Sequence, residues 1–444
     1  MPVELAPPTA LLLNETVPPK ISSPTARNPW TWVPTLYVAE GLPYALAMSV
    51  SLVLYKNLGV SNAAVAFYTS WLYLPWVIKP LWSPVVDLLR TRRWWIWTMQ
   101  LLLGAGLAGV ALTIPAPHFF QWTLLFFWLL AFSSATHDIA ADGFYMLATT
   151  EREQSLFIGF RSAFYRVASI GAQGGLVILA GKIFSRTGDY AFAWSVSFGL
   201  MAGLLLGLGA YHRFALPRPA VDQPGLAGAS KKFFAEFLRT FGTFFQKPKI
   251  AVLLAFLLLY RFGEAQLVKV AQLFLLDARG KGGLGLATEQ VGFIYGTIGV
   301  IVFLLGALLG GLVVARRGLK FWLWPMLLAI HLPDAVFIWL AYAQPENLTA
   351  ISMGIAVEQF GYGFGFTAFM LYMIHIARGP HQTAHYAICT GFMALGMMLP
   401  GMWSGWLQEL IGYPHFFTWV ILATIPSFLV VMIIPLDREF GKKV

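Results

Sequence analysis

Long apolar stretches separated by short polar joints make up most of the chain. Apolar runs of about 18 or more residues are typical of transmembrane helices, and one span needs about 20 residues. The pattern predicts twelve such helices, over residues 31–56, 61–86, 94–114, 120–148, 154–181, 190–212, 248–276, 288–315, 320–342, 348–376, 383–409 and 414–436. The predicted fold class is all-α, a polytopic membrane protein with twelve transmembrane helices in two six-helix halves.

One long polar connection divides these helices six and six. Residues 213–247 contain prolines and then a basic, partly apolar stretch at 231–239, which is typical of a helix that lies in the membrane interface. We therefore expect a cytoplasmic tail at 1–30, an amino-terminal half at 31–212, a basic linker at 213–247, a carboxy-terminal half at 248–436 and a second tail at 437–444.

The composition excludes several classes of protein. Hydrophobic residues make up 58% and charged residues 11%, against about 25% charged residues in soluble domains, so a water-soluble fold is excluded. The single cysteine, Cys389, excludes a disulfide framework and the usual thiolate metal sites. No Gly-x4-Gly-Lys-Ser/Thr phosphate loop occurs, so ATP hydrolysis does not drive this protein. We expect no cofactor, no metal and no enzymatic activity.

The basic residues are distributed unequally between the two sets of joints. Of the 30 Lys and Arg residues, 20 lie in the set that includes both termini and the central connection, 5 lie in the other set and 5 lie within helices. Cytoplasmic joints accumulate Lys and Arg, so both termini are predicted to be cytoplasmic. The net charge of +10 follows from this bias and gives no argument for nucleic-acid binding.

Eleven ionisable residues lie inside the predicted spans, namely Glu40, Lys79, Asp138, Asp142, Arg161, Arg166, Arg261, Glu264, Lys269, Asp334 and Glu358. Each would cost about 3 kcal/mol near a helix centre if it faced lipid, so they must face each other or water. One interpretation is a set of ion pairs that hold the helices together. The other is a polar cavity for a charged substrate or ion.

Asp138 and Asp142 are one helical turn apart and project from the same face of the fourth helix. Two close carboxylates in a low dielectric usually share a proton, which makes the pair a candidate for proton coupling. A competing interpretation is that Arg161 and Arg166 of the next helix neutralise them. The two interpretations are compatible.

Two further carboxylates lie beside glycines. Arg261 and Glu264 share one helical face, with Gly263 between them allowing a bend. Glu358 precedes three glycines within residues 361–365, where a locally broken helix can line a cavity, although glycines at this spacing also permit close helix packing. Glu264 and Glu358 are therefore additional candidates for proton coupling.

Two other spacings are weak signals. His137 and Asp142 match a His-x4-Asp acyltransferase spacing but lie deep in an apolar run. His381 and His385 have the i, i+4 spacing of a metal pair but lack the intervening Glu and the third ligand of a zinc hydrolase. Neither pair predicts a catalytic site.

An ordered series of motifs indicates a family. The two sets of six helices around a basic connection resemble the major facilitator superfamily, and Ser83-Pro-Val-Val-Asp87 is similar to its signature between helices two and three. More specifically, the chain resembles the AmpG-type muropeptide permeases, a branch that includes acetyl-CoA transporters. The similar motifs are Gly41-Leu-Pro43, Lys79-Pro-Leu-Trp-Ser-Pro-Val-Val-Asp87, Asp138-Ile-Ala-Ala-Asp142, Gly159-Phe-Arg161, Tyr260-Arg-Phe-Gly-Glu264, Val314-Ala-Arg-Arg-Gly-Leu319 and Ser404-Gly-Trp-Leu-Gln-Glu409.

The resemblance implies proton-coupled import of cell-wall fragments, an amino sugar linked to a short peptide, across the inner membrane of a bacterium. It also implies a substrate site between two repeated halves and a conformational gate at Asp87, Arg90, Arg92 and Arg93. Departures from the family pattern are Glu40 before the glycine of helix one, His137 where glutamine is common, and Arg261 and Glu264 in place of lysine and aspartate.

The residues inside the spans suit such a ligand. Its carboxylates could pair with the basic side chains of Lys79, Arg161, Arg166, Arg261 and Lys269. Its sugar rings could stack on the aromatic side chains of Tyr145, Tyr362, Trp71 and Trp76. Aromatic residues also anchor helices at the membrane interface, which is the competing interpretation for those four. The expected partners are an anionic glycopeptide or related solute, protons and the bilayer, with no nucleic acid, and the chain is expected to be a monomer.

Three other functions remain open from the sequence. The same fold serves proton-driven transport of other amphiphiles or sugars, including export, although five basic residues inside the spans argue against cationic substrates. A membrane-embedded acyl or acetyl transferase is the alternative from another class. A signalling or scaffold protein is disfavoured by the energetic cost of the buried charges.

Overall fold

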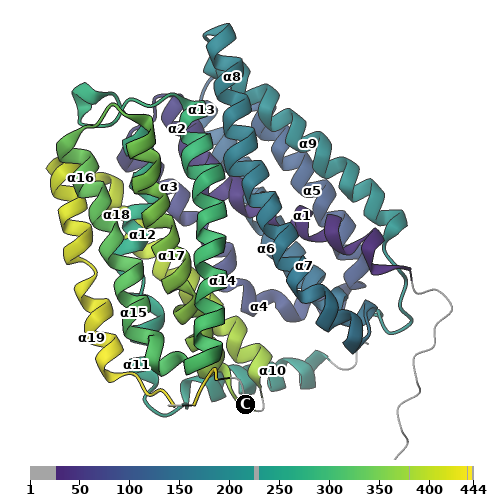
Figure 1. The fold of residues 1–444 in the computed structure, drawn as a ribbon. Helices are drawn as coiled ribbons and strands as arrows, with labels where there is room; N and C mark the ends of the chain where they lie inside the picture. Colours follow the sequence, from purple (N-terminus) through teal and green to yellow (C-terminus); the bar gives the residue numbers. More distant parts are fainter. Residues whose placement is uncertain (1–26, 225–229, 380, 438, 443–444) are drawn as a thin grey trace, which may run out of the picture.

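The computed structural model describes residues 27–224, 230–379, 381–437 and 439–442, and helices cover almost all of them (Figure 1). Before residue 216 these are η1 (Pro29–Thr31), α1 (Val33–Ala45), η2 (Leu46–Val50), α2 (Ser51–Asn57), α3 (Asn62–Trp71), α4 (Leu74–Leu89), α5 (Arg92–Thr113), α6 (Phe119–Ala148), α7 (Glu151–Ile170), η3 (Gly171–Leu176), α8 (Val177–Thr187) and α9 (Tyr190–Ala215). Helix α10 (Ser230–Phe245) follows.

The remaining helices are α11 (Ile250–Leu259), α12 (Phe262–Leu276), η5 (Arg279–Lys281), α13 (Thr288–Val291), η6 (Gly292–Gly299), α14 (Val300–Arg317), α15 (Leu319–His331), η7 (Leu332–Asp334), α16 (Ala335–Ala343), α17 (Leu348–Ala377), α18 (Gln382–Leu422) and α19 (Ile425–Ile433). The short elements η2, η3 and η6 are π-helical. All of them lie within longer helical runs, so each predicted span corresponds to one helix or to consecutive helices.

Ten stretches of the described chain are long and apolar enough to cross a membrane. The last, Ala384–Ile433, has 50 residues and covers most of predicted spans eleven and twelve. Gly412 separates them, because its φ of 75° and ψ of 164° turn the chain within α18. The predicted span at 61–86 is not among the ten, since α3 and α4 have only 10 and 16 residues and the turn at Leu72 separates them. The structure confirms the all-helical membrane fold and is consistent with twelve spans.

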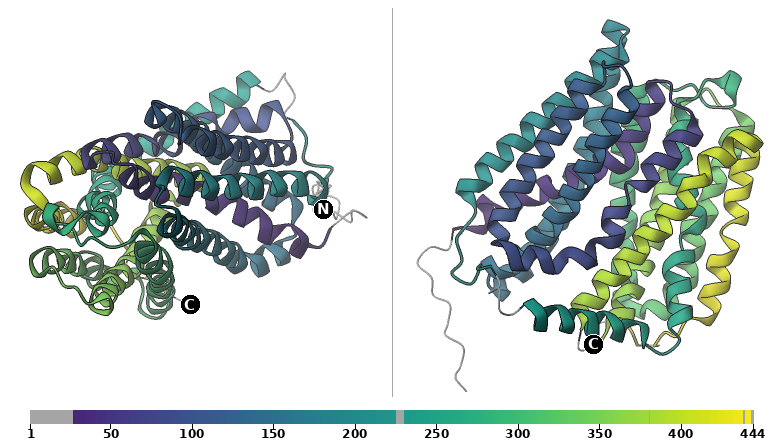
Figure 2. Two further views of the ribbon diagram at one scale, coloured as in Figure 1. Left: turned by 90° about the horizontal axis from the view of Figure 1, so that it is seen from above. Right: turned by 180° about the vertical axis from the view of Figure 1, so that it is seen from behind.

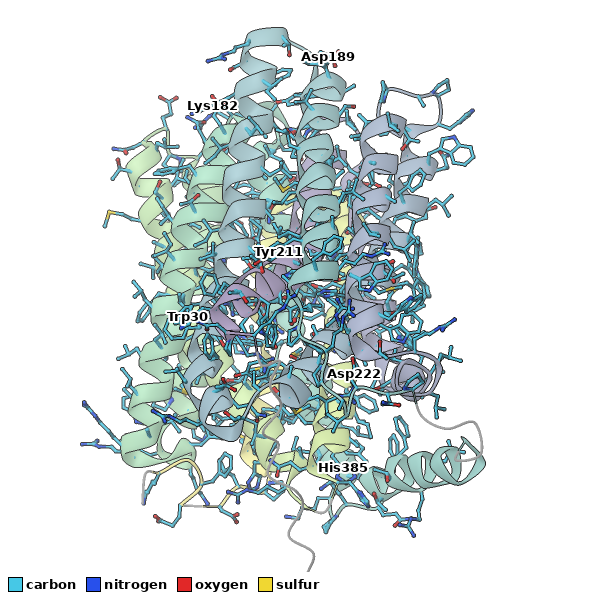
Figure 3. The ribbon with its side chains drawn as sticks, turned by 90° about the vertical axis from the view of Figure 1, so that its right-hand side faces the viewer. Trp30, Lys182, Asp189, Tyr211, Asp222 and His385 are labelled. Atoms are coloured by element: carbon cyan, nitrogen blue, oxygen red, sulfur yellow. The ribbon has the colours of Figure 1, made fainter. Side chains whose placement is uncertain are left out.

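Helix α10 differs from the others in its direction. Figures 1 and 2 show it lying across one end of the bundle, beneath the ends of the long helices. A helix is thus present over the predicted stretch 231–239, and its place in the membrane interface stays a prediction. The side chains of residues 231–237 fall outside the described part of the chain. In Figure 3, Lys182 and Asp189 lie at the opposite end of the bundle from His385.

Several breaks within helices lie beside ionisable residues. Pro43 lies inside α1, one turn after Glu40, and the π-helical turn η2 follows. Arg261 separates α11 from α12, with non-helical φ and ψ of −113° and 20°. Pro333 is part of the 3-10 turn η7, which ends at Asp334. Proline removes a backbone donor and disturbs the preceding turn, which accounts for the break at Pro333, where α15 ends at His331.

The hydrophobic core consists of four clusters of buried side chains. The largest is built mainly from helices α1 to α9, but Ala265 and Leu273 of α12 and Met397 of α18 belong to it. Helices from the two ends of the sequence therefore pack directly on each other. At Gly296 of η6, an added Cβ would collide with the backbone of Gln173 and Gly174 in η3, so glycine permits this close approach.

Candidate functional site

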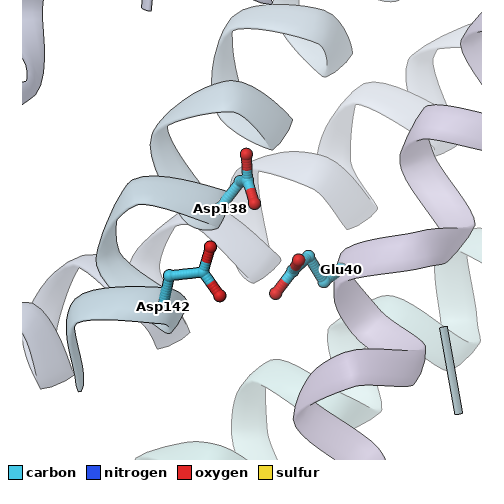
Figure 4. A group of neighbouring side chains, drawn as sticks. All are labelled: Glu40, Asp138 and Asp142. Atoms are coloured by element: carbon cyan, nitrogen blue, oxygen red, sulfur yellow. The ribbon is translucent and has the colours of Figure 1, made fainter. Parts of the chain in front are cut away.

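Three carboxylates from two helices meet inside the bundle. Glu40 of α1 and Asp138 and Asp142 of α6 each place one oxygen within 4.8 Å of the others (Figure 4). Asp138 and Asp142 are one turn apart, as the sequence predicts. We call Glu40, Asp138 and Asp142 the acidic cluster.

Two cations hold this cluster. The Lys79 ammonium of α4 pairs with Asp138, and the Arg161 guanidinium of α7 pairs with Asp142. Arg161 lies 4.3 Å from the ring centroid of Tyr37 and 4.4 Å from that of Tyr145. Cation–π contacts on two rings fix the position of this guanidinium. The predicted residues Lys79, Arg161 and Tyr145 thus surround the predicted aspartate pair.

The charges of the cluster do not balance. Three carboxylates against Lys79 and Arg161 leave one negative charge, and Oε2 of Glu40 is buried with no hydrogen-bond partner in the described residues. A proton or another monovalent cation would neutralise the group, whereas a divalent metal would leave it positive. Asp142 is the most accessible side chain of the two ion pairs, 45% exposed against 22–23% for the other three members. The cluster therefore lacks one positive charge, and Asp142 is the more accessible of its two paired carboxylates.

The sequence analysis gave Glu40 as an ionisable residue within a predicted span and as a departure from the family pattern, but not as a proton-coupling candidate. Its position next to Gly41 explains how it reaches α6, because a Cβ on Gly41 would lie 2.8 Å from the Tyr165 carbonyl oxygen of α7. Helix α1 thus packs closely against α7 and brings Glu40 beside the aspartates. The presence of an acid in an apolar span was the only sequence signal for this role.

A third ion pair lies at the break between α11 and α12. The Arg261 guanidinium donates to both Glu264 oxygens, at 2.6 and 3.0 Å, and to the Tyr362 hydroxyl at 2.5 Å. Arg261 also lies 4.7 Å from the ring centroid of Phe366. Both members of the pair are buried, Glu264 completely. The structure thus brings together the predicted residues Arg261, Glu264 and Tyr362.

The other predicted residues are more dispersed. Glu358 is buried in α17 and accepts a hydrogen bond from Gln359 at 3.0 Å. Arg166 lies 4.5 Å from the ring centroid of Phe303 in α14, whereas the described ion pairs of the two aspartates are with Arg161 and Lys79. Arg166 of α7 therefore contacts a helix of the other predicted half.

Lys269 is buried on α12 and contacts the other half of the sequence. Its ammonium donates to the Thr69 hydroxyl at 3.0 Å and lies 5.2 Å from the ring centroid of Tyr73. The ring of Trp76 packs edge-on against that of Tyr44, with 5.3 Å between the ring centroids. Trp71 packs against the largest hydrophobic cluster. Aromatic side chains therefore lie close to the interface between helices of the two halves.

The residues predicted as a conformational gate lie at the end of α4 and the start of α5. The backbone N–H groups of Arg92 and Arg93 donate to the two oxygens of Asp222, at 2.8 and 3.0 Å, so the segment after α9 folds onto this helix terminus. The Arg93 side chain donates to the Leu216 carbonyl at 3.3 Å. Arg90 lies 5.7 Å from the ring centroid of Trp94, and the side chain of Asp87 falls outside the described residues.

A polar network that sequence reasoning missed joins the two predicted halves. Lys56 of α2 pairs with Asp277 after α12 at 2.6 Å, and Asp277 also accepts from Asn62 at 3.2 Å and Tyr413 at 2.5 Å. Asn62 further donates to Gln408 of α18 at 2.6 Å. We call these five residues the polar lock. Burial raises the pKa of Asp277, but the Lys56 ammonium and the hydrogen bonds from Tyr413 and Asn62 outweigh it and hold that pKa below its ordinary value.

The two weak motifs have structural partners. His137 lies 2.9 Å from the Gln100 amide, which is linked in turn to His212 at 2.7 Å. His385 contacts the Thr243 hydroxyl at 3.1 Å, and its ring centroid is 6.0 Å from that of His381. Among the residues that the structure describes, the acidic cluster is the one group of three potential ligands with metal-site spacing.

Comparisons with known proteins agree with this architecture. The Major Facilitator Superfamily model matches residues 36–399. The anhydromuropeptide permease of Escherichia coli K12 is 23% identical and the alignment covers 91% of this chain and 79% of that protein. The putative transporter AmpG 4 of Rickettsia conorii is 24% identical, over 89% of this chain and 94% of that protein.

The fold is also similar to solved transporter structures. The crystal structure of the nucleoside transporter NupG superposes with a TM-score of 0.68 at 12% identity, covering 93% of this chain and 100% of that one. This similarity concerns the fold alone. Since the family model extends over most of the chain, the protein belongs to the Major Facilitator Superfamily and is a membrane transporter rather than an enzyme.

Proposed function

We propose that this protein is a proton-coupled importer of anionic cell-wall glycopeptides, similar to anhydromuropeptides, in the inner membrane of a bacterium. The observation that carries the proton coupling is the acidic cluster, in which three carboxylates face two cations. Uptake of one proton neutralises it, and release restores one negative charge. A change of one charge inside a low-dielectric interior can bias the equilibrium between two conformations.

The substrate class is supported by the relatives and by the buried cations. The E. coli relative is named an anhydromuropeptide permease. Arg166 and Lys269 lie near the interface between helices of the two halves. The described contact of the Arg166 guanidinium is with the ring of Phe303. The Lys269 ammonium contacts the Thr69 hydroxyl and the ring of Tyr73. A ligand carboxylate would give either cation a charge-assisted partner. By contrast, Arg261 and Arg161 already have carboxylates, so they position acids in the substrate-free protein.

The proposal includes an orientation and a division into halves. The halves at 31–212 and 248–436 move against each other in alternating access, with residues 213–247 as the linker and both termini cytoplasmic. The asymmetric distribution of Lys and Arg supports this orientation. Cysteines placed at Arg92, Lys231 and Lys320, with Cys389 removed, would then be protected from an impermeant thiol reagent added outside intact cells. Labelling of these sites from outside would contradict the orientation.

Uptake into liposomes that contain the purified protein tests the function. An anhydromuropeptide, its amidated form, a plain sugar, a peptide and a cationic amphiphile are each offered with an inward proton gradient, a sodium gradient or no gradient. We expect concentrative uptake of the anhydromuropeptide alone, driven by the proton gradient. Uptake driven by sodium, or of the cationic amphiphile instead, would refute the proposal.

Variants of the acidic cluster connect the activity to the site. Glu40→Gln and Asp138→Asn should each abolish gradient-driven accumulation while exchange down a substrate gradient continues, because an amide cannot bind and release the proton. Asp189→Asn is the matched control, since Asp189 only caps α9 and asparagine caps a helix equally well. Full accumulation by Glu40→Gln and Asp138→Asn would place the proton site elsewhere.

A further inference from the structure

The carboxy-terminal half contains an acid for which the proposed function has no role. Asp334 ends the 3-10 turn η7 between α15 and α16, and only 1% of its surface is exposed. Neither of its carboxyl oxygens has a hydrogen-bond partner among the described residues. It stands at the N-cap position of α16 and yet makes no capping bond to that helix. An unpaired, buried carboxylate is strongly destabilised, so the neutral acid is the form that this conformation accommodates.

No ion pair among the described residues includes Asp334 or Glu358. The titratable group closest in sequence is His331, whose two ring nitrogens also lack described partners. Arg261 is engaged with Glu264. Asp334 and Glu358 therefore have no cationic partner among the described residues.

The packing of α17 places Glu358 on the helix face that meets α15 and η7. A Cβ on Gly361 would lie 2.8 Å from the Pro333 ring, and one on Gly365 would collide with Ile330 and the Met326 carbonyl. This face of α17 therefore lies against α15 and η7. Glu358 is three residues before Gly361 and so lies on the same face of α17. The glycines allow the two acids to approach across the break at Pro333.

We propose that Asp334 and Glu358 form a second proton-binding site, separate from the acidic cluster, so that transport moves more than one proton per substrate. The proposal rests on the proposed proton-coupled function. The 3-10 turn lacks the regular hydrogen bonding of the neighbouring helices, which makes it the part of this span best suited to rearrange. Rearrangement that exposes Asp334 to water allows its proton to leave, and closure requires its return.

Infrared spectroscopy tests the protonation of Asp334 without any substrate. Wild-type protein at neutral pH should show the carbonyl band of a protonated carboxyl group that Asp334→Asn lacks. Glu346→Gln is the matched control, because Glu346 is an exposed acid in the connection after α16 and its loss should leave the band unchanged. Equal spectra of wild type and Asp334→Asn would overturn the proposal. Loss of the wild-type band on adding sodium at constant pH would assign the site to that ion instead.

The number of coupled protons tests the transport role. With the membrane potential clamped at zero, each coupled proton multiplies the limiting accumulation about tenfold per pH unit of gradient. In Asp334→Asn the limiting accumulation per pH unit of gradient should be about tenfold lower than in the wild type. The substrate affinity at acidic pH should be unchanged. An unchanged dependence overturns the second site alone. If wild-type uptake does not depend on the proton gradient, the proposed function is wrong. The infrared spectra would still show whether Asp334 is protonated.

Discussion

Lys56 and Asp277 form an ion pair across the two predicted halves, with 2.6 Å between Nζ and Oδ1 and side chains only 15% and 8% exposed. Figure 1 shows α2, which carries Lys56, and α13, which follows Asp277, at the end of the bundle opposite to α10. The polar lock therefore holds the halves together at that end. In the proposed orientation this is the periplasmic end, which must open for a substrate to enter.

Asp277→Asn should favour opening of the polar lock. Hydrogen bonds to a charged group contribute about 1.5–3 kcal/mol, so we expect a shift of about 2 kcal/mol toward the open state. Pulsed electron paramagnetic resonance measures the opening as the distance between a spin label at Val60 in the amino-terminal half and one at Gly280 in the carboxy-terminal half. Asp189→Asn, an exposed acid at the same end of the bundle, should leave the distance distribution unchanged. An unchanged distribution in Asp277→Asn would show that apolar packing closes this end.

The polar lock should be insensitive to mildly acidic pH. The pKa of Asp277 is lower in this structure than its ordinary value of about 3.9. An acid with a lowered pKa stabilises the closed state above its ordinary pKa and loses that contribution as pH falls through the lowered value. The spin-label distance should therefore be constant between pH 7 and about pH 5 and increase only below the ordinary pKa. A midpoint between pH 5 and 7 would assign opening to another group.

Lys79 and Asp138 should show coupled effects on stability. Lys79→Ala leaves Asp138 without its cation in a cluster that already carries an excess negative charge, at a cost of about 2 kcal/mol for side chains that retain some solvent contact. Asp138→Ala should cost less, because it leaves two carboxylates facing two cations. The double variant should be more stable than the sum of the two losses predicts. Thermal unfolding in detergent measures all four proteins. Additive losses would show that the ion pair contributes nothing.

Arg166 and Arg261 should differ in their effects on ligand binding. Arg261 is bound by Glu264, so Arg261→Gln should mainly lower stability. Arg166 lies over Phe303, and Arg166→Gln should weaken binding of a carboxylate-bearing glycopeptide by about tenfold to a hundredfold. Tryptophan fluorescence titration with the acid and with its amidated form measures both variants. Equal losses for the two ligands in Arg166→Gln would make Arg166 structural.

Gly296→Ala should disturb the contact between η3 and η6. The added methyl group would collide with the backbone of Gln173 and Gly174, and overpacking of this kind costs about 1–3 kcal/mol. Gly175→Ala is the matched control on η3, because a Cβ there meets no atom within 4 Å. We expect a lower unfolding temperature for Gly296→Ala only. Equal unfolding temperatures would indicate that the two halves separate easily at this point.

The sequence by itself determined the helices and the types of residue that lie among them. Apolar runs of sufficient length form helices in a bilayer because backbone groups must be satisfied within each segment, which is a local requirement. The one-turn spacing of Asp138 and Asp142 and the i, i+3 pair of Arg261 and Glu264 follow from helix geometry in the same way. These local features were predicted, and the family was identified from short motifs.

The tertiary structure decided which charges meet. Glu40 and Asp138 are far apart in the sequence, and nothing local indicates that α1 packs against α6 and α7 through Gly41. The same holds for Lys56 with Asp277, which pair only because α2 and α12 lie side by side. Long-range pairing depends on how helices pack, and packing depends on side-chain shapes from several helices at once. A pattern along one helix therefore predicts its faces but not the partners that face them.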